Sequence, residues 1–204
     1  MKLTAMMAMA AVMGAALETV AWAGEIGGTN EGNERTVKVC MEPGTDIFTA
    51  LRAQTVASKI FAEIGVKIEW HRQNSCPAEA LLISISNSTP ADLLPGALAY
   101  ALPYEGTHIV VFYDRVQKMV EPGTAPYLLG HVLAHEITHI LQGVNRNSPS
   151  GVMKAHWESD DFLKMKWRPL SFTEEDVTLI HLSLDARASR RAGSALVAVN
   201  ILPR

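Results

Sequence analysis

Charged residues and cysteines are both scarce in this chain of 204 residues. Charged residues make up 19% of it, with 18 lysines and arginines against 21 aspartates and glutamates. A net charge of −3 offers no general basic surface for nucleic acid or for an anionic membrane, so we expect neither as a partner. Hydrophobic residues reach 48%, which suits one globular domain with a buried core. We find no internal repeat and no second domain.

Long hydrophobic runs are missing as well. The apolar stretch from Leu3 to Leu17 has about 15 residues, which is short for a membrane span. Lys2 precedes it and Ala21-Trp22-Ala23 follows it, the order of a secretory signal peptide with an A-x-A cleavage site. We therefore expect residues 1–23 to be removed. The mature protein would then be secreted or periplasmic and would have no stable membrane span.

The only two cysteines are Cys40 and Cys76. Neither belongs to a C-x-x-C unit, so a zinc site built from them is not expected. In an oxidising compartment an even number of cysteines favours a disulfide, which would stabilise the fold by roughly 3–4 kcal/mol in the chain-entropy model. Two unpaired buried thiols are the alternative.

Hydrophobic periodicity predicts an α+β domain over residues 36–188, after a flexible leader over 24–35 and before a C-terminal tail over 189–204. A strand, a helix and a strand over 36–41, 47–64 and 66–71 predict a right-handed crossover with parallel strands. The two cysteines would then lie beyond the same ends of both strands. Further strands are expected over 80–86 and 107–113. Helices are expected over 114–120, over 127–141, and from a capping box at 173–176 to about residue 187.

The expected helix over 127–141 carries His135-Glu136-Ile137-Thr138-His139, which is the pattern H-E-x-x-H. Residues four apart lie one turn apart on one helix face, so both histidines can direct a ring nitrogen at one Zn²⁺ ion. Glu136 then lies beside the ion, where its carboxylate can act as base on a bound water. The helix is apolar nearly all round, and two buried imidazoles and a carboxylate need a partner that a metal supplies. A chance occurrence of this short pattern is the alternative.

The residues after this helix resemble the metzincin clan of zinc peptidases. Gly143 follows the helix, and a Pro-Ser-Gly turn leads to Val152-Met153, which would be the methionine turn of that clan. The loop is more similar to a group of exported bacterial metzincin-like proteins with H-E-I-T-H-x-L-Q-G, followed by Arg-His-Ser and Gly-Val-Met-Lys. Two departures from the metzincin pattern stand out. The glycine falls four residues after His139 instead of three, and no histidine lies in the third-ligand region. Against the pattern of the bacterial metzincin-like group, Asn147 occupies the place of the third histidine.

This resemblance implies a zincin-like (metzincin-type) single domain, with a mixed twisted sheet, an active-site helix and a C-terminal helix. It also implies a Zn²⁺ cofactor held by His135, His139 and Asn147, with Glu136 as the catalytic residue. The expected partner is a peptide or protein substrate. The segment over residues 101–106 also resembles the metzincin-like group, and in metzincins an edge strand ahead of the active-site helix borders the cleft.

The third ligand has several candidates. Asn147 matches the pattern best, but its amide oxygen is a weak neutral donor for zinc. His156 is a better donor that lies beyond the methionine turn, and Glu158 would complete the site in the gluzincin pattern, which needs a helix there. His131 lies four residues before His135, and ligands spaced i, i+4 and i+8 spread along a helix by about 12 Å, too far for one ion.

Two functions are therefore open. The first is an exported zinc-dependent endopeptidase in which a zinc-bound water attacks the peptide bond and Glu136 acts as general base. The alternative is a catalytically weakened or inactive metzincin-like protein that keeps the cleft to bind a peptide or protein. The intact Glu136 favours the enzyme, whereas Asn147 in the third-ligand position favours the binding protein. The substrate sequence and the oligomeric state do not follow from the sequence.

Overall fold

The computed structural model describes residues 35–42, 44–93, 95–102 and 106–199, and side chains as far as residue 193. In this part of the chain five strands form one mixed sheet in the order β2-β1-β3-β5-β4. The strands are β1 (Arg35–Met41), β2 (Val66–Arg72), β3 (Leu81–Ser86), β4 (Ala99–Ala101) and β5 (His108–Phe112). The helices are α1 (Ile47–Ala62), α2 (Tyr113–Met119), α3 (Ala125–Gln142), α4 (Ser159–Trp167) and α5 (Glu174–Val199). The predicted α+β class is confirmed.

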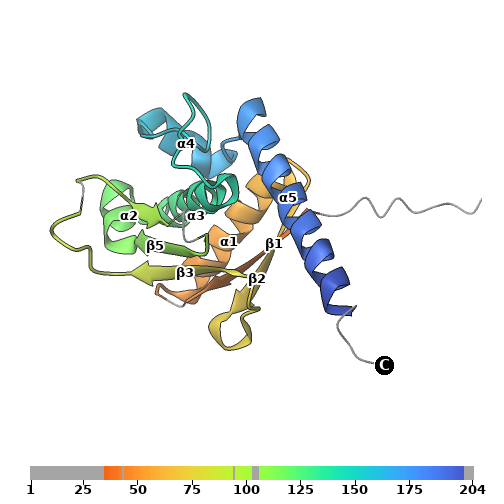
Figure 1. Cartoon of the computed structure of the whole chain (residues 1–204). Coiled ribbons are helices and arrows are strands. Elements are labelled where there is room, and N and C mark those ends of the chain that lie inside the picture. The colour runs from red at the N-terminus through yellow and green to blue at the C-terminus, as the bar shows by residue number, and fades with distance from the viewer. Residues whose placement is uncertain (1–34, 43, 94, 103–105, 200–204) are drawn as a thin grey trace, which may run out of the picture. The chain divides into compact units, whose positions relative to one another are not determined.

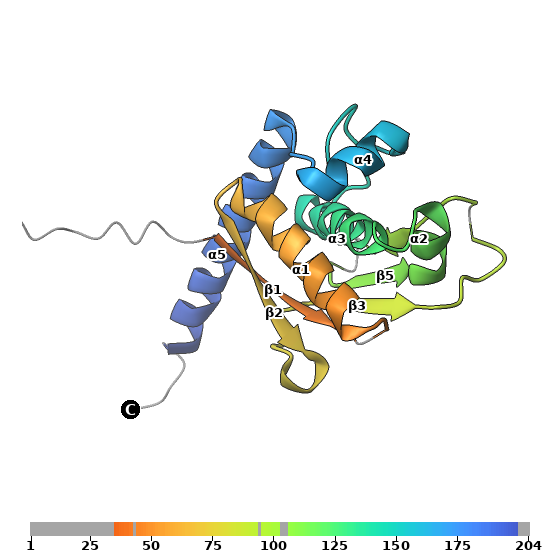
Figure 2. The same cartoon turned by 180° about the vertical axis from the view of Figure 1, so that it is seen from behind.

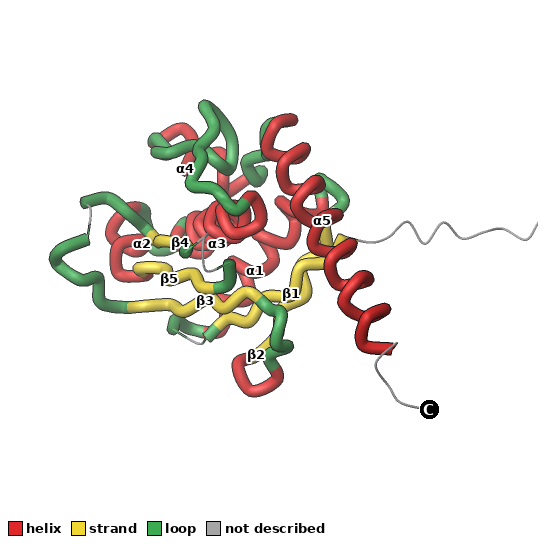
Figure 3. The backbone as a smooth tube through the Cα atoms, in the orientation of Figure 1, coloured by secondary structure: helices red, strands yellow, loops and turns green. Residues whose placement is uncertain are grey.

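Four of the five strands run in parallel. β1 pairs with β2 along its whole length, from Arg35 opposite Val66 to Met41 opposite Arg72, and pairs with β3 on its other side. β3 in turn pairs in parallel with β5. The crossover from β1 through α1 to β2 therefore confirms the parallel neighbours that the sequence predicts. Figure 3 shows these strands in yellow beneath the helices.

Helices α1 and α3 lie side by side over one face of the sheet (Figures 1 and 2). Asp46 caps α1, because its carboxylate accepts a hydrogen bond of 3.0 Å from the N–H of Thr49. The two helices approach closely at Gly130 of α3. A Cβ atom added to Gly130 would lie 2.5 Å from Cβ of Val56 and 2.8 Å from the carbonyl oxygen of Ala53. Glycine at this position allows the two helices to touch.

Helix α3 is buried along nearly its whole length, as the sequence predicts. It begins at Ala125, two residues before the expected start, and Pro126 lies in its first turn, where the missing N–H of proline breaks no helical hydrogen bond. It ends at Gly143, whose φ of 69° is in the left-handed region and whose N–H donates to the carbonyl oxygen of His139 at 2.9 Å. Helices α1, α2, α4 and α5 and strands β4 and β5 all contact α3. The helix that carries the H-E-x-x-H pattern is therefore the centre of the packing.

Helix α5 corrects the prediction for the end of the chain. The capping box at its start is confirmed, since the N–H of Thr173 donates to Asp176 at 3.1 Å and the N–H of Asp176 donates to Thr173 at 3.2 Å. The helix does not end near Arg187, however, but continues to Val199. Residues 189–199 are thus helical and do not form an irregular tail, because arginine, alanine and leucine in this stretch favour helix.

Several other boundaries differ from those expected. Arg35 already belongs to β1, so the predicted leader is one residue too long. β5 ends at Phe112, and Tyr113 is the first residue of α2. Neither β4 nor α4 was predicted as a regular element. β4 pairs antiparallel with β5, with Ala99 opposite Val111, and forms one edge of the sheet.

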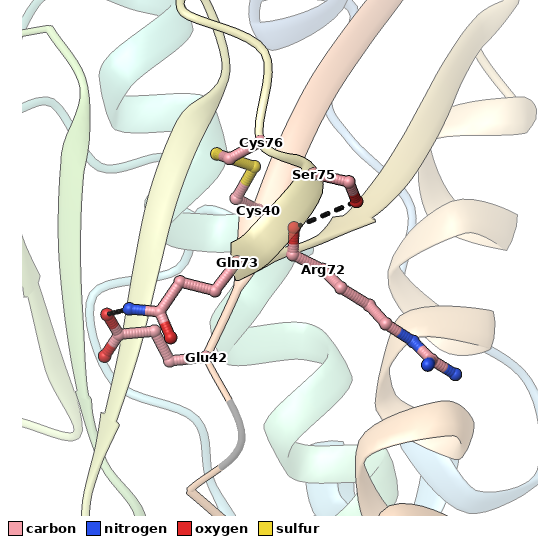
Figure 4. Close-up of a disulfide and its surroundings, with 6 residues drawn as sticks. All are labelled: Cys40, Glu42, Arg72, Gln73, Ser75 and Cys76. Carbon is pink, nitrogen blue, oxygen red and sulfur yellow. Dashed lines mark hydrogen bonds between the residues drawn. A yellow bond between two sulfur atoms is a disulfide. The ribbon is translucent and has the colours of Figure 1, made fainter.

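Cys40 and Cys76 form a disulfide, with their Cα atoms 5.8 Å apart (Figure 4). Cys40 lies in β1, and Cys76 follows the 3-10 turn Gln73–Ser75 that comes after β2. The amide of Gln73 also donates a hydrogen bond of 2.6 Å to the carboxylate of Glu42. The predicted disulfide is confirmed, and it fixes the end of β2 to β1.

Residues 1–34, which include the predicted signal peptide over 1–23 and nearly all of the predicted leader, lie outside the described residues. Within the described ranges, no helix is both long enough and apolar enough to cross a membrane.

Candidate metal centre

The rings of His135 and His139 converge on one side of α3. Their Nε2 atoms lie 3.0 Å apart, and the ring planes are nearly perpendicular at 81°. This is the placement on one helix face that a spacing of four residues predicts. Two nitrogens at this separation can both reach one metal ion at a bond length of about 2.1 Å.

Backbone carbonyls determine which ring nitrogens remain free. Nδ1 of His135 lies 2.9 Å from the carbonyl oxygen of Val152, and Nδ1 of His139 lies 3.3 Å from that of Val144. A carbonyl oxygen only accepts hydrogen bonds, so each Nδ1 carries the proton and each Nε2 of a neutral ring presents a lone pair. Metal-binding histidines are commonly oriented in this way by a backbone carbonyl.

Burial keeps both imidazoles neutral. Burial and the neighbouring His135 lower the pKa of His139 to about 4, and only 5% of the His139 residue is exposed. Burial also lowers the pKa of His135, partly opposed by its hydrogen bond to Val152. In the tautomer that satisfies both carbonyl contacts, the two Nε2 lone pairs of the neutral rings face each other. This is the form of histidine that binds a metal.

Glu136 lies next to the two rings in sequence and is itself 8% exposed. Among the described residues none donates a hydrogen bond to its carboxylate, and burial raises the pKa of Glu136 to about 8. An ionised carboxylate in such a place needs a neighbouring positive charge. The side chain lines an open cavity together with His135.

This cavity has a volume of about 390 Å³ and lies between α3, the edge strand and the loop after α3. Its wall includes residues 95–99, which lead into and begin β4, and residues 103–105 of the segment expected to border it lie outside the described residues. Its apolar lining residues include Leu98, Ala99, Met119, Val132, Trp157 and Phe162. Its polar lining residues include Asn145, Asn147, Lys154 and His156.

The chain after α3 forms a tight turn that contains Met153. The N–H of Ser148 donates to the carbonyl oxygen of Met153 at 2.7 Å, and Met153 is fully buried. Gly151 has φ of 75°, and an added Cβ there would collide with the carbonyl oxygen of Ser171, so the turn requires glycine. The same turn presents the Val152 carbonyl to His135.

Two of the candidates for a third ligand share the cavity with His135 and Glu136. They are Asn147 and His156, and both are exposed residues. Glu158 is engaged elsewhere, because its carboxylate caps α4 and lies 3.3 Å from Nζ of Lys154. Glu158 starts a helix and does not lie within one, so the gluzincin arrangement is not formed.

His131 is a structural residue, as its position on the helix suggests. Its Nδ1–H donates to the carbonyl oxygen of Tyr127 at 2.8 Å, and its Nε2 accepts from the N–H of Leu170 at 3.0 Å. Both ring nitrogens are thus used, and burial lowers its pKa to about 4. His181 is bound to the turn after α1 through the carbonyl oxygen of Ile64 at 2.7 Å. Neither histidine is available to a metal.

Trp157 is a member of the site that the sequence did not reveal. Its ring packs edge-on against His135, with centroids 5.6 Å apart, and against His131 at 6.3 Å. Its indole N–H donates to the carbonyl oxygen of Gly151 at 3.2 Å, which fixes the ring against the turn. No periodic pattern marks this tryptophan, so only its sequence position beside His156 hinted at it.

The donor set is therefore incomplete by the usual standard for zinc. Within the part of the chain that the structure describes, no group of three histidine, cysteine, aspartate or glutamate side chains is placed to hold a metal ion. His135 and His139 fit zinc as nitrogen donors. The third-ligand candidates that line the cavity are Asn147 and His156. No family model matches the chain, and neither does any curated protein.

Proposed function

We propose that this protein is an exported zinc-dependent endopeptidase of metzincin type, in which His135 and His139 bind the metal and Glu136 is the general base. The observation that carries this proposal is the convergence of the Nε2 atoms of His135 and His139, 3.0 Å apart, on the helix from which His135 and the buried Glu136 line an open cavity. Two lone pairs at this distance repel each other unless a cation lies against both. A zinc ion is the cation that paired imidazoles in proteins bind most often.

The order of the elements supports a zincin-like fold. The mixed sheet ends in an antiparallel edge strand, β4, whose residues border the cavity. Helix α3 with the H-E-x-x-H pattern follows, then the turn that contains Met153, and then the C-terminal helix α5. This is the sequence of elements that the resemblance to metzincins requires.

When bound, a zinc ion lowers the pKa of a water molecule and polarises a substrate carbonyl group. Glu136 is the general base in this cavity, where its carboxylate can accept a proton from the attacking water and return it to the leaving amine. A nearby cation favours the ionised form of Glu136, whose pKa burial alone raises to about 8.

We assign the third ligand position to Asn147, whose side chain lines the cavity and is the closest match to the third histidine of the resemblance. The weakness of an amide donor favours a second candidate function. In that case the protein is a catalytically inactive relative of the metzincins that retains the cleft to bind a peptide or protein. The absence of a third histidine, cysteine or carboxylate among the described residues at the site is the observation behind this alternative.

Export is supported by the disulfide between Cys40 and Cys76, because such bonds persist in oxidising compartments. The signal peptide predicted over residues 1–23 provides the route. We therefore propose that the mature protein acts in the periplasm or outside the cell on peptide or protein substrates.

The experiment that tests the proposed activity compares wild-type protein with Glu136→Gln on an unfolded substrate such as casein. The amide keeps the size of the side chain but cannot accept the proton, so hydrolysis should fall by a factor of about 10² or more while the zinc content is unchanged. Glu158→Gln is the matched control, since this glutamate is exposed and caps α4. Equal hydrolysis by Glu136→Gln and wild type would exclude Glu136 as the base. A zinc-loaded wild type with no hydrolysis would favour the binding protein.

A further inference from the structure

Asp176, at the start of α5, is a fully buried carboxylate with a complete set of hydrogen bonds. One oxygen accepts from the hydroxyl of Ser148 at 2.7 Å and from Nη2 of Arg146 at 2.9 Å. The other oxygen accepts from the N–H of Thr173 at 3.1 Å and from its hydroxyl at 2.7 Å. A capping residue needs only the contacts with Thr173. The other two bonds reach across 28 and 30 residues of sequence to the loop after α3.

These two loop residues are the immediate neighbours of Asn147. The segment over 145–147 has no helical or turn structure and leads into a bridge between Ser148 and Lys154. Arg146 and Ser148 both bind Asp176, whereas Asn147, which lies between them, lines the cavity that contains His135 and Glu136.

The loop is held from a second direction by its own backbone. The N–H of Ser148 donates to the carbonyl oxygen of Met153, and this bond closes the loop without involving Asp176. Nη1 of Arg146 also lies 3.1 Å from the hydroxyl of Ser148, so the two anchors contact each other. The conformation at Asn147 is therefore fixed on one side by the methionine turn and on the other by the carboxylate.

We infer that Asp176 is a positioning residue of the metal centre, which holds Arg146 and Ser148 so that Asn147 is presented to the ion bound by His135 and His139. The inference rests on the proposed function. A short amide side chain is a weak donor, so it contributes to binding only if its backbone is already in place. Removing a residue that orients a metal ligand without contacting the metal typically lowers metal affinity by about 10–100-fold.

The test is a double-mutant cycle on zinc affinity, measured by competition with a chelator of known affinity. Asp176→Asn should weaken zinc binding about tenfold in the wild-type background. In the Asn147→Ala background the same substitution should change zinc affinity less than twofold, because the group that Asp176 positions is gone. Asp185→Asn is the matched control on α5, since this exposed aspartate pairs with Arg35 far from the loop.

A purely structural role for Asp176 predicts a different pattern. A loss of stability in the presence of chelator is expected in either case, but with a purely structural role the effect of Asp176→Asn on zinc affinity would be the same with and without Asn147. If Asp176→Asn does not fold, Ser148→Ala removes one of the two anchors, and the same cycle is measured with it. Equal effects in the two backgrounds overturn the inference.

The outcomes also separate this inference from the proposed function. A wild type that binds no zinc through His135 and His139 overturns both. A wild type that binds zinc normally, with an unchanged affinity in Asp176→Asn, overturns the positioning role alone. Coupling between Asp176 and Asn147 supports both.

Discussion

The Nε2 atoms of His135 and His139 lie 3.0 Å apart, and each ring directs its Nδ1 proton to a backbone carbonyl from the chain that follows the helix. The spacing on α3 brings the rings together, but residues Val144 and Val152 decide that the free nitrogens face each other. The helix therefore provides the two imidazoles, and the loop and the turn that contains Met153 provide their orientation. Both parts are needed for a metal site.

Replacing Asn147 by histidine should raise zinc affinity at least tenfold, which corresponds to about 1.4 kcal/mol. The substitution exchanges a neutral amide oxygen for an imidazole nitrogen at a position whose backbone already faces the cavity. Chelator competition measures the affinity, and the thermal midpoint at fixed zinc should rise with it.

Ala97→His is the matched control for this substitution, because Ala97 also lines the cavity but lies outside the loop that would provide the third ligand. An unchanged affinity in Asn147→His, together with a sharp loss in His156→Ala, would contradict the assignment. The third ligand would then lie beyond Met153.

Gly130→Ala should lower the free energy of unfolding by about 1–3 kcal/mol, which is the usual cost of overpacking a core. The new Cβ would lie 2.5 Å from Cβ of Val56, and α1 and α3 would have to move apart. Urea unfolding measures the change. Gly123→Ala is the control, since no atom lies within 4 Å of its added Cβ. Equal stability of the two variants would show that the helices can separate without cost.

Asp176→Asn should lower the free energy of unfolding at neutral pH by about 2–3 kcal/mol, with a smaller loss in acid. Burial alone would raise the pKa of Asp176, but hydrogen bonds from Thr173 and Ser148 and the charge of Arg146 hold it below its ordinary value of 3.8. A carboxyl group whose pKa is lowered by folding contributes stability that is fully present above its unfolded pKa. That contribution is lost as the pH falls through the folded pKa.

Urea unfolding in chelator at pH 7, 5 and 3 measures this dependence. The difference between wild type and Asp176→Asn should be constant from pH 7 to 5 and shrink near pH 3. If the difference in unfolding free energy between wild type and Asp176→Asn does not change with pH, the negative charge of Asp176 does not contribute to stability.

Local signals in the sequence identified most of the core elements. Asp46 and the glycine after residue 64 bracket α1, and the apolar helix up to Gly143 is α3, because caps and periodicity are encoded within a few residues. The disulfide was predictable for a similar reason, since a parallel crossover places Cys40 and Cys76 near each other.

The elements that escaped prediction depend on distant partners or lack a periodic face. β4 has only three residues, Ala99–Ala101, and becomes a strand because β5 lies beside it. α4 buries only Met165, so no apolar stripe marks it, and its capping box of Glu158 and Asp161 was not recognised as a helix start. The extension of α5 past Arg187 was not predicted because residues 189–199 are basic and then apolar, without a periodic apolar stripe.

The same limit applies to the site. His135, Glu136 and His139 follow from a spacing of four residues, whereas the role of Asp176 comes from contacts with residues 28 and 30 positions away. In sequence Asp176 is only the last residue of a capping box. Its contact with the loop follows from the packing of α5 against α3, which no local pattern encodes.

The central claim is that His135 and His139 form a metal site, and the zinc content of the purified mature protein tests it most directly. Elemental analysis should find about one zinc per chain in the wild type and little in His135→Ala and His139→Ala. His131→Ala is the matched control on the same helix and should keep its zinc if it folds, because both nitrogens of His131 are bound to backbone groups. Equal zinc in wild type and His139→Ala, or none in either after exposure to zinc, would contradict the account.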